Sequence, residues 1–267
     1  MDVHVAADLL SLASLGAFVA TATMLSLWGA HRTLGNASLV DVGWAFTLGV
    51  LALLAAALGT GDPTRRLIVA LVGGVWSARL TIHLVHRIAT EPEDPRYAEM
   101  RARWGGNLGA KFLALFVGQG ILDVILAVPF FLAAIDPSPA LHPMVWAGVA
   151  LASISVIGEA TADTQLRTFR SNPANRGQVC RVGLWSWSRH PNYFFEWLIW
   201  CAFALLALGS PLGGLALFPP VLMLYFLTRV TGIKATEAHA VRSRGEAYRR
   251  YQREVSAFVP WPPTVER

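Results

Sequence analysis

Ionisable and aromatic side chains recur at one-turn spacing inside segments that are otherwise apolar. Asp41 and Trp44 lie three residues apart near the start of the second apolar segment, and Arg79 and His83 lie four apart in the third. A charged side chain in a bilayer costs about 3 kcal/mol or more, so such residues usually face the interior of a helix bundle. These positions are therefore candidates for a functional site.

A ladder of acids and then bases follows the fifth apolar segment. Glu159, Asp163, Arg167 and Arg170 are spaced by three or four residues, so they share one face of a helix. One interpretation is a stripe of ion pairs at a helix end. The alternative is a ligand site, which the residues that follow the ladder favour.

The loop after this ladder combines arginines, among them Arg181, with glycine and tryptophan, and it leads into SRHPNYFFEW, residues 188–197. Pro191 suits the first turn of a helix. Helix N-termini and arginines both bind phosphate, and Asn192 and Glu196 would follow on one face of the new helix. Alternatively, these arginines lie at the level of the lipid headgroups. Their combination with paired polar residues predicts a nucleotide site.

Several other site classes are excluded. Neither GxGxxG nor GxxxxGK[ST] occurs, so the nucleotide site is of neither the Rossmann nor the P-loop type. The seven histidines form no HExxH motif, and Cys180 and Cys201 form no CxxC pair, so no metal site is expected.

The composition indicates an integral membrane protein. Hydrophobic residues make up 54% of the 267-residue chain and charged residues 15%, against about 25% in soluble domains. The net charge of +5 needs no nucleic-acid partner, because membrane topology explains it. We predict an all-α, polytopic fold with about seven spans: 9–31, 39–59, 65–88, 112–134, 141–162, 192–209 and 212–231.

Loop charges predict the orientation of these spans. Eighteen lysines and arginines fall on one side of the membrane and two on the other, which places the N-terminus outside and the C-terminus inside. We expect a multi-pass protein of the bacterial inner membrane or its equivalent, with the cofactor site facing the cytoplasm. Nothing indicates the oligomeric state.

No internal repeat or soluble domain interrupts the chain, so we expect a single membrane domain over 1–267. Its first part, 1–134, would hold an apolar lipid substrate if the chain acts as the family that its motifs resemble does. Its second part, 141–267, would bind the nucleotide with the help of the loop 163–191 and the tail 232–267.

Three stretches resemble the membrane-embedded steroid 5-alpha-reductase family: EATADTQLRTFR, CRVGLWSWSRHPNYFFE and GEAYRRYQREVSAFVPW. They occur in the same order as in that family. The resemblance implies seven spans with NADPH buried among the helices and reached from the cytoplasm. It also implies that the cofactor contacts residues at eight positions: Glu159 (where the steroid enzymes have asparagine), Asp163, Arg167, Arg170, Arg181, Asn192, Tyr193 and Glu196.

The family reaction is hydride transfer from NADPH to the β-carbon of an α,β-unsaturated ketone, such as a 3-oxo-Δ4 steroid. Negative charge then develops on the ketone oxygen, which needs a hydrogen-bond donor. In the family an acid and a tyrosine hold this oxygen. Asp41 matches the acid and with Trp44 would bind the substrate, whereas Leu84 occupies the tyrosine position. His83, or Tyr97 in DPRYAEMR, could replace the tyrosine. We expect the pair Asp41 and His83, with apolar surroundings that keep Asp41 neutral.

Two other functions stay open. The C-terminal motifs also resemble the isoprenylcysteine carboxyl methyltransferases, which use S-adenosylmethionine and have fewer spans. A lipid-binding or transport protein could also use buried charges to stabilise helix packing or conduct protons.

Overall fold

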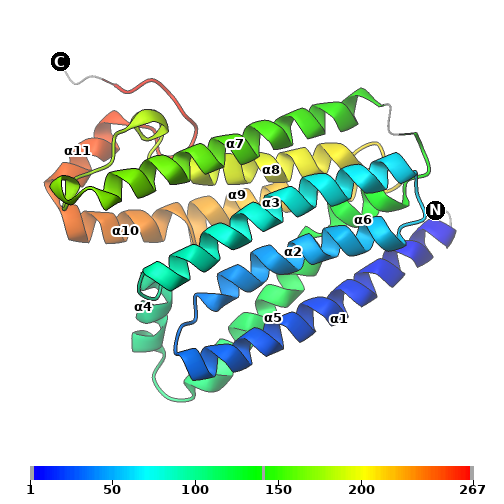
Figure 1. Cartoon of the computed structure of the whole chain (residues 1–267), viewed down its shortest axis with the longest axis horizontal. Helices are drawn as coiled ribbons and strands as arrows, with labels where there is room; N and C mark the ends of the chain where they lie inside the picture. Colours follow the sequence, from blue (N-terminus) through cyan, green and yellow to red (C-terminus); the bar gives the residue numbers. More distant parts are fainter. Residues whose placement is uncertain (1–2, 140–141, 265–267) are drawn as a thin grey trace. The chain divides into compact units, whose positions relative to one another are not determined.

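The computed structural model describes residues 3–139 and 142–264, which form helices joined by loops, with no strand among them (Figure 1). The predicted all-helical class is confirmed. The longer elements are α1 (Val3–Leu34), α2 (Leu39–Leu58), α3 (Pro63–Thr90), α4 (Pro95–Trp104), α5 (Leu108–Leu126), α6 (Val128–Ile135), α7 (Pro143–Ser171), α8 (Pro191–Ala207), α9 (Phe218–Tyr225), α10 (Ile233–Arg244) and α11 (Glu246–Glu254). The short helical turns are η1 (Pro173–Asn175), η2 (Gly183–Ser186), η3 (Gly213–Leu217) and the π-helix η4 (Phe226–Val230).

Six stretches in the described part of the chain are long and apolar enough to cross a membrane: His4–Leu34, Leu39–Leu58, Pro63–Thr90, Leu108–Ile135, Pro143–Ser171 and Gly213–Arg244. The sixth predicted span, 192–209, corresponds to α8. This apolar helix has 17 residues, so it is only about 25 Å long. A hydrocarbon core is about 30 Å thick. The predicted multi-pass class is therefore supported by six long apolar stretches and one shorter apolar helix in the described part of the chain.

The chain divides into two compact units. The first comprises Met1–Trp146 and Leu205–Pro219, and the second comprises Ala147–Ala204 and Pro220–Arg267. The segment that joins α8 to α9 thus belongs with the N-terminal helices. The expected assignment of substrate to one part of the chain and nucleotide to the other stays a prediction.

In the first unit, α2 and α3 approach closely because small residues face each other. A Cβ atom on Gly49 would lie 2.1 Å from Ser77 Oγ, and one on Gly73 would lie 2.6 Å from the Ala52 Cβ. Ser77 Oγ also donates a hydrogen bond to Ala45 O at 2.7 Å. Such contacts are typical of membrane bundles, in which tight backbone packing drives helix association. Figure 1 shows α1, α2 and α3 side by side.

Two arginines at the junction of α2 and α3 have structural roles. Arg65 forms a buried ion pair with Asp136 (3.1 Å) and donates to Ser138 O (2.7 Å). Arg66 donates to Ala56 O at 2.7 Å and so satisfies a carbonyl at the end of α2. The loop charges predict that these two arginines lie on the opposite side of the membrane from the other eighteen basic residues. Both arginines connect helix ends through their hydrogen bonds.

Prolines lie in the first turns of two of the helices. Pro129 lies at the start of α6, and Ala127 separates that helix from α5. Pro219 and Pro220 lie in the first turn of α9, which continues into the π-helix η4. A π-helical turn leaves the regular bonding pattern and is often found near functional sites.

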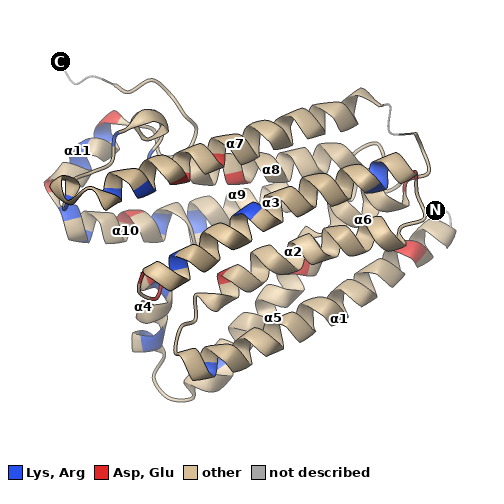
Figure 2. Ribbon diagram, in the orientation of Figure 1, with Lys and Arg blue, Asp and Glu red and all other residues tan. Residues whose placement is uncertain are grey.

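In the second unit, the end of α7 holds the loop that precedes α8. A Cβ atom on Gly158 would lie 2.4 Å from the Phe195 ring, so only glycine lets α8 approach here. Trp185 Nε1 donates to Ala162 O at 2.9 Å, and Gln165 Oε1 accepts from a backbone amide of the same loop. Figure 2 shows the charged residues of this unit gathered on α10, α11 and the end of α7.

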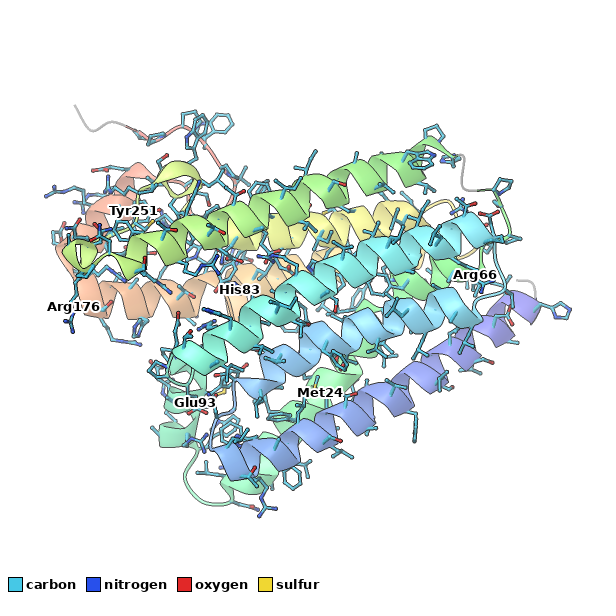
Figure 3. The ribbon with its side chains drawn as sticks, in the orientation of Figure 1. Met24, Arg66, His83, Glu93, Arg176 and Tyr251 are labelled. Carbon is cyan, nitrogen blue, oxygen red and sulfur yellow. The ribbon has the colours of Figure 1, made fainter. Side chains whose placement is uncertain are left out.

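The C-terminal segment after α10 closes on this loop. Tyr251 on α11 donates to Trp185 O at 2.5 Å (Figure 3). Ser188 forms a parallel bridge with Ser256 and donates to Phe258 O at 2.8 Å. The sequence before α8 is therefore fixed from both sides, by α7 and by the C-terminal segment.

Candidate functional site

Two helix starts bring the first set of polar side chains together. Asp41 lies in the first turn of α2. α4 begins after Asp94, whose carboxylate accepts a hydrogen bond from Arg96 N and caps the helix. Ser38, the residue before α2, accepts a hydrogen bond from Asp94 N at its Oγ (2.9 Å). This hydrogen bond connects Ser38, the residue before α2, to Asp94, the residue that caps α4.

The carboxylates of Asp41 and Asp94 are joined by arginine and tyrosine. Tyr97 Oη donates to Asp41 Oδ1 at 2.6 Å, and Arg96 Nη2 donates to Asp41 Oδ2 at 2.9 Å. Arg96 Nε contacts Asp94 Oδ1 at 2.9 Å, and Arg87 Nη2 contacts Asp94 Oδ2 at 2.6 Å. Every carboxylate oxygen therefore has a partner. We name this group the Asp41 cluster: Ser38, Asp41, Arg87, Asp94, Arg96 and Tyr97.

The charges of this cluster fix the protonation of its members. Burial alone would raise the pKa of Asp94, but the hydrogen bonds and charges of Arg96 and Arg87 lower it to about 2. Burial and the negative charge of Asp41 raise the pKa of Tyr97 well above its ordinary value. Tyr97 is thus a neutral hydroxyl, able to donate, near the ionised carboxylate of Asp94.

A small hollow opens beside the Asp41 cluster. Its volume is about 10 Å³, and Asp41, Leu84, Arg87 and Asp94 are among the residues that line it. That volume holds about one water molecule. Leu84, at the position of the family tyrosine, therefore lies beside the predicted acid, while the hydroxyl that reaches the acid comes from Tyr97.

Trp44, a predicted substrate contact, lies one turn after Asp41. Its ring meets Trp76 edge-on, with centroids 5.8 Å apart. It also packs against the apolar group that contains Tyr97 and Phe112. The Asp41 cluster therefore borders an aromatic, apolar region, although the substrate role of Trp44 stays a prediction.

The surroundings of Asp41 differ from the sequence-based expectation. His83 lies on α3 (Figure 3), but the hydrogen bonds to the Asp41 carboxylate come from Tyr97 and Arg96. The site is polar rather than apolar, because α4 delivers a guanidinium group to it. The sequence contained a signal for α4, since Asp94 before a proline is a typical helix start. The catalytic role of His83 stays a prediction.

The second set of polar side chains lies at the start of α8, which begins at Pro191 as predicted. Asn192 Nδ2 lies 3.4 Å from Asp163 Oδ1 on α7. Asn192 Oδ1 is buried and accepts no hydrogen bond within residues 3–139 and 142–264. Two predicted cofactor residues thus meet, and one presents an unused acceptor.

Two buried acids extend this region. Glu196 lies one turn after Asn192, and its Oε1 accepts a hydrogen bond from Trp200 Nε1 at 2.9 Å. Glu159, one turn before Asp163 on α7, is also buried. We name this group the Asn192 cluster: Glu159, Asp163, Asn192 and Glu196.

The predicted cofactor arginines divide into two kinds. Arg167 and Arg170 are exposed at the end of α7. Arg181 instead forms an ion pair with Glu254 and lies 5.1 Å above the centre of the Tyr251 ring. The guanidinium of Arg181 therefore holds the C-terminal segment against the loop.

The residues between the loop and α8 also hold the C-terminal segment. Arg189 Nε contacts Glu237 Oε1 at 2.6 Å, and His190 Nε2 lies 3.3 Å from the same oxygen. Tyr193, a predicted cofactor contact, stacks on His190 and lies 3.2 Å from Thr236 Oγ1. Burial lowers the pKa of His190, so the ring is neutral near pH 7. Arg189 and His190 are thus anchors of α10.

The fold and these clusters define a multi-pass helical membrane protein with two polar centres. The chain belongs to the family described as Protein of unknown function (DUF1295), whose model matches residues 27–255. It is also similar to "Uncharacterized protein C594.04c" of Schizosaccharomyces pombe, with 29% identity over 206 residues. That alignment covers 67% of this chain and 60% of the yeast protein. No solved structure matches. The resemblance to steroid 5-alpha-reductases therefore stays a hypothesis.

Proposed function

We propose that this protein is an NADPH-dependent reductase that saturates the C=C bond of an α,β-unsaturated ketone in an apolar lipid. The observation that carries the proposal is the 2.6 Å hydrogen bond from Tyr97 to Asp41. It supplies the acid and tyrosine that carbonyl polarisation requires, even though Leu84 replaces the family tyrosine in sequence. The sequence motifs of the Asn192 cluster support the choice of cofactor.

In the proposed reaction Tyr97 is the donor and Asp41 positions it. The Tyr97 hydroxyl rotates and donates its hydrogen bond to the ketone oxygen instead of to Asp41. Arg96 keeps its ion pair with the Asp41 carboxylate. Hydride adds to the β-carbon, the C=C electron pair shifts, and the resulting enolate oxygen accepts the Tyr97 hydrogen bond. A proton from water then adds to the α-carbon and restores the ketone. Tyr97 supports this role because its phenol is neutral and 6% exposed.

The side chains of the second unit suit NADPH. The buried Asn192 Oδ1 needs a donor, which a carboxamide or ribose hydroxyl would supply. Arg167 and Arg170 are exposed beside the cluster and would pair with phosphate. NADPH, when bound, supplies the hydride, and these residues hold and orient it.

The test is to purify the chain in mild detergent and measure binding of NADPH, NADH and S-adenosylmethionine by equilibrium dialysis. Oxidation of NADPH in the presence of a 3-oxo-Δ4 steroid is then followed by absorbance. We expect NADPH to bind and the steroid to be reduced at its C=C bond.

Two results would overturn the proposal. Binding of S-adenosylmethionine in place of NADPH would favour a methyltransferase. Absence of binding by all three compounds, in a protein that keeps its helical circular dichroism, would favour a lipid-binding or transport protein.

A further inference from the structure

An exposed apolar surface lies outside the spanning helices of the second unit. It consists of Val182, Trp187, Val259 and Trp261, which are 51%, 48%, 52% and 69% exposed. We name it the tryptophan surface. Its two halves come from the loop before α8 and from the C-terminal segment, and the hydrogen bond from Trp261 N to Trp187 O (2.9 Å) joins them. Large apolar residues gathered in this way mark a docking surface.

The segment that carries Val259 and Trp261 is a closed loop. It leaves α11 at Val255 and returns to the same helix end, where Thr264 N donates to Glu254 O at 2.8 Å. Phe258 points inward and packs against Phe194, with centroids 5.7 Å apart. The inward side of the loop is thus occupied by Phe258, while Val259 and Trp261 are left outside.

The position of this surface along α7 corresponds to the edge of a bilayer. Ile157 is the last strongly exposed apolar residue of α7. The loop is fastened to α7 at Ala162 through Trp185, five residues or about 7.5 Å further along the helix. The headgroup region extends roughly 5 to 7.5 Å beyond each side of the hydrocarbon core, so the loop is fastened near the outer limit of this region, where tryptophan concentrates.

The charge around the tryptophan surface is basic. The loop 163–191 and the tail 232–267 together contain twelve lysines and arginines against five acids. Arg249, Arg250 and Arg253 are exposed on α11, the helix from which the closed loop leaves. Figure 2 shows basic residues on this helix. Basic residues at a membrane surface attract anionic lipid headgroups.

We propose that the tryptophan surface inserts into the headgroup region of the membrane that the protein spans, and that the arginines of α11 select anionic phospholipids there. The inserted loop anchors α11 to the bilayer surface. This role is independent of the reaction proposed above and of any bound nucleotide.

The experiment measures the depth of a nitroxide at position 259 in nanodiscs. The label is attached to Val259→Cys in a chain that also carries Cys180→Ala and Cys201→Ala. Collision with oxygen, which dissolves in lipid, is compared with collision with a water-soluble nickel complex. The matched control is Ala174→Cys in η1, which replaces a small exposed residue. Ala174 lies beyond the end of α7 at Ser171, and that helix end is about 21 Å past Ile157 along the helix.

We expect the oxygen-to-nickel collision ratio at position 259 to exceed that at position 174 several-fold. The ratio should rise further when phosphatidylglycerol replaces part of the phosphatidylcholine. The combined variant Arg249→Gln, Arg250→Gln and Arg253→Gln should lose that second rise. High salt should also remove the rise in the collision ratio caused by phosphatidylglycerol. Because that experiment needs no arginine substitution, it tests the same point even if the triple variant fails to fold.

Two results would overturn the proposal. One is a collision ratio at position 259 equal to that at position 174. The other is an equal depth in neutral and anionic nanodiscs at low salt.

Discussion

The Asp41 cluster and the Asn192 cluster are both polar groups within an apolar bundle, yet they are completed differently. In the first, both carboxylates are bonded at both oxygens by Arg87, Arg96 and Tyr97. In the second, the Asn192 Oδ1 is buried without a donor in the described chain. A complete network holds a reacting group in place, whereas an open acceptor indicates a place for a ligand. This difference supports the proposal that the first cluster takes part in the reaction and the second binds the cofactor.

The largest effect that we expect is a loss of enone reduction without a loss of NADPH binding. Tyr97→Phe removes the donor for the enolate oxygen, so we expect enone reduction to fall by about 100-fold or more. NADPH affinity should be unchanged. Turnover and equilibrium binding are measured on the same preparation. Tyr225→Phe is the control, because that tyrosine is 57% exposed on α9. Full activity of Tyr97→Phe would remove Tyr97 from the mechanism.

The next effect concerns stability. The lowered pKa of Asp94, about 2, means that its ionised form stabilises the fold by about 2 kcal/mol at neutral pH. Asp94→Asn keeps the helix cap but loses the stabilisation that the ionised carboxylate provides. Because the folded pKa is lowered, the stabilisation is complete above about pH 4 and disappears as the pH falls to about 2.

Thermal unfolding of Asp94→Asn and the parent across this pH range measures the difference. Glu99→Gln is the control, since its side chain is 42% exposed and forms an ion pair with the exposed Arg103. Such exposed pairs contribute about 0 to 1 kcal/mol. A gap between Asp94→Asn and the parent that is the same at pH 2 and pH 7 would contradict the charge assignment.

A smaller effect tests the open acceptor. Asn192→Ala removes the Oδ1 that we assign to NADPH, so the dissociation constant should rise about 5- to 10-fold, the size of one hydrogen bond. Fluorescence titration with NADPH measures it. Gln178→Ala, which removes an exposed amide in the loop before α8, should leave the constant unchanged. Equal affinities for parent and Asn192→Ala would sink the assignment.

The smallest effect distinguishes the arginines. Arg181 is committed to Glu254 and Tyr251, so Arg181→Gln should change NADPH affinity less than about 2-fold. Arg167→Gln, at an exposed position, should lower the preference for NADPH over NADH. Parallel titrations with both nucleotides measure that preference. The reverse order of effects would mean that Glu254 yields Arg181 to the cofactor.

The sequence predicted the parts of this molecule that depend on local pattern. Hydropathy located the long helices, and Pro191 located the start of α8. The sequence offered Tyr97 only as an alternative to His83, and it did not predict that Arg96 would also reach Asp41, because these contacts join residues about 55 positions apart through two helix caps. Nor did the spacing of Arg181 reveal its ion pair with Glu254, which lies 73 residues further along the chain. Side-chain partners between distant helices require the fold.

The buried ion pair of Arg65 and Asp136 constrains how the chain is made. Arg65 is synthesised 71 residues before its partner. At 5 to 20 residues per second, it waits roughly 4 to 14 s for that partner. It also donates to Leu206 O (3.4 Å), which is synthesised later still. Until those segments are made, Arg65 lacks these partners and needs water or lipid headgroups in their place, so this end of the first unit closes only after Leu206 is made.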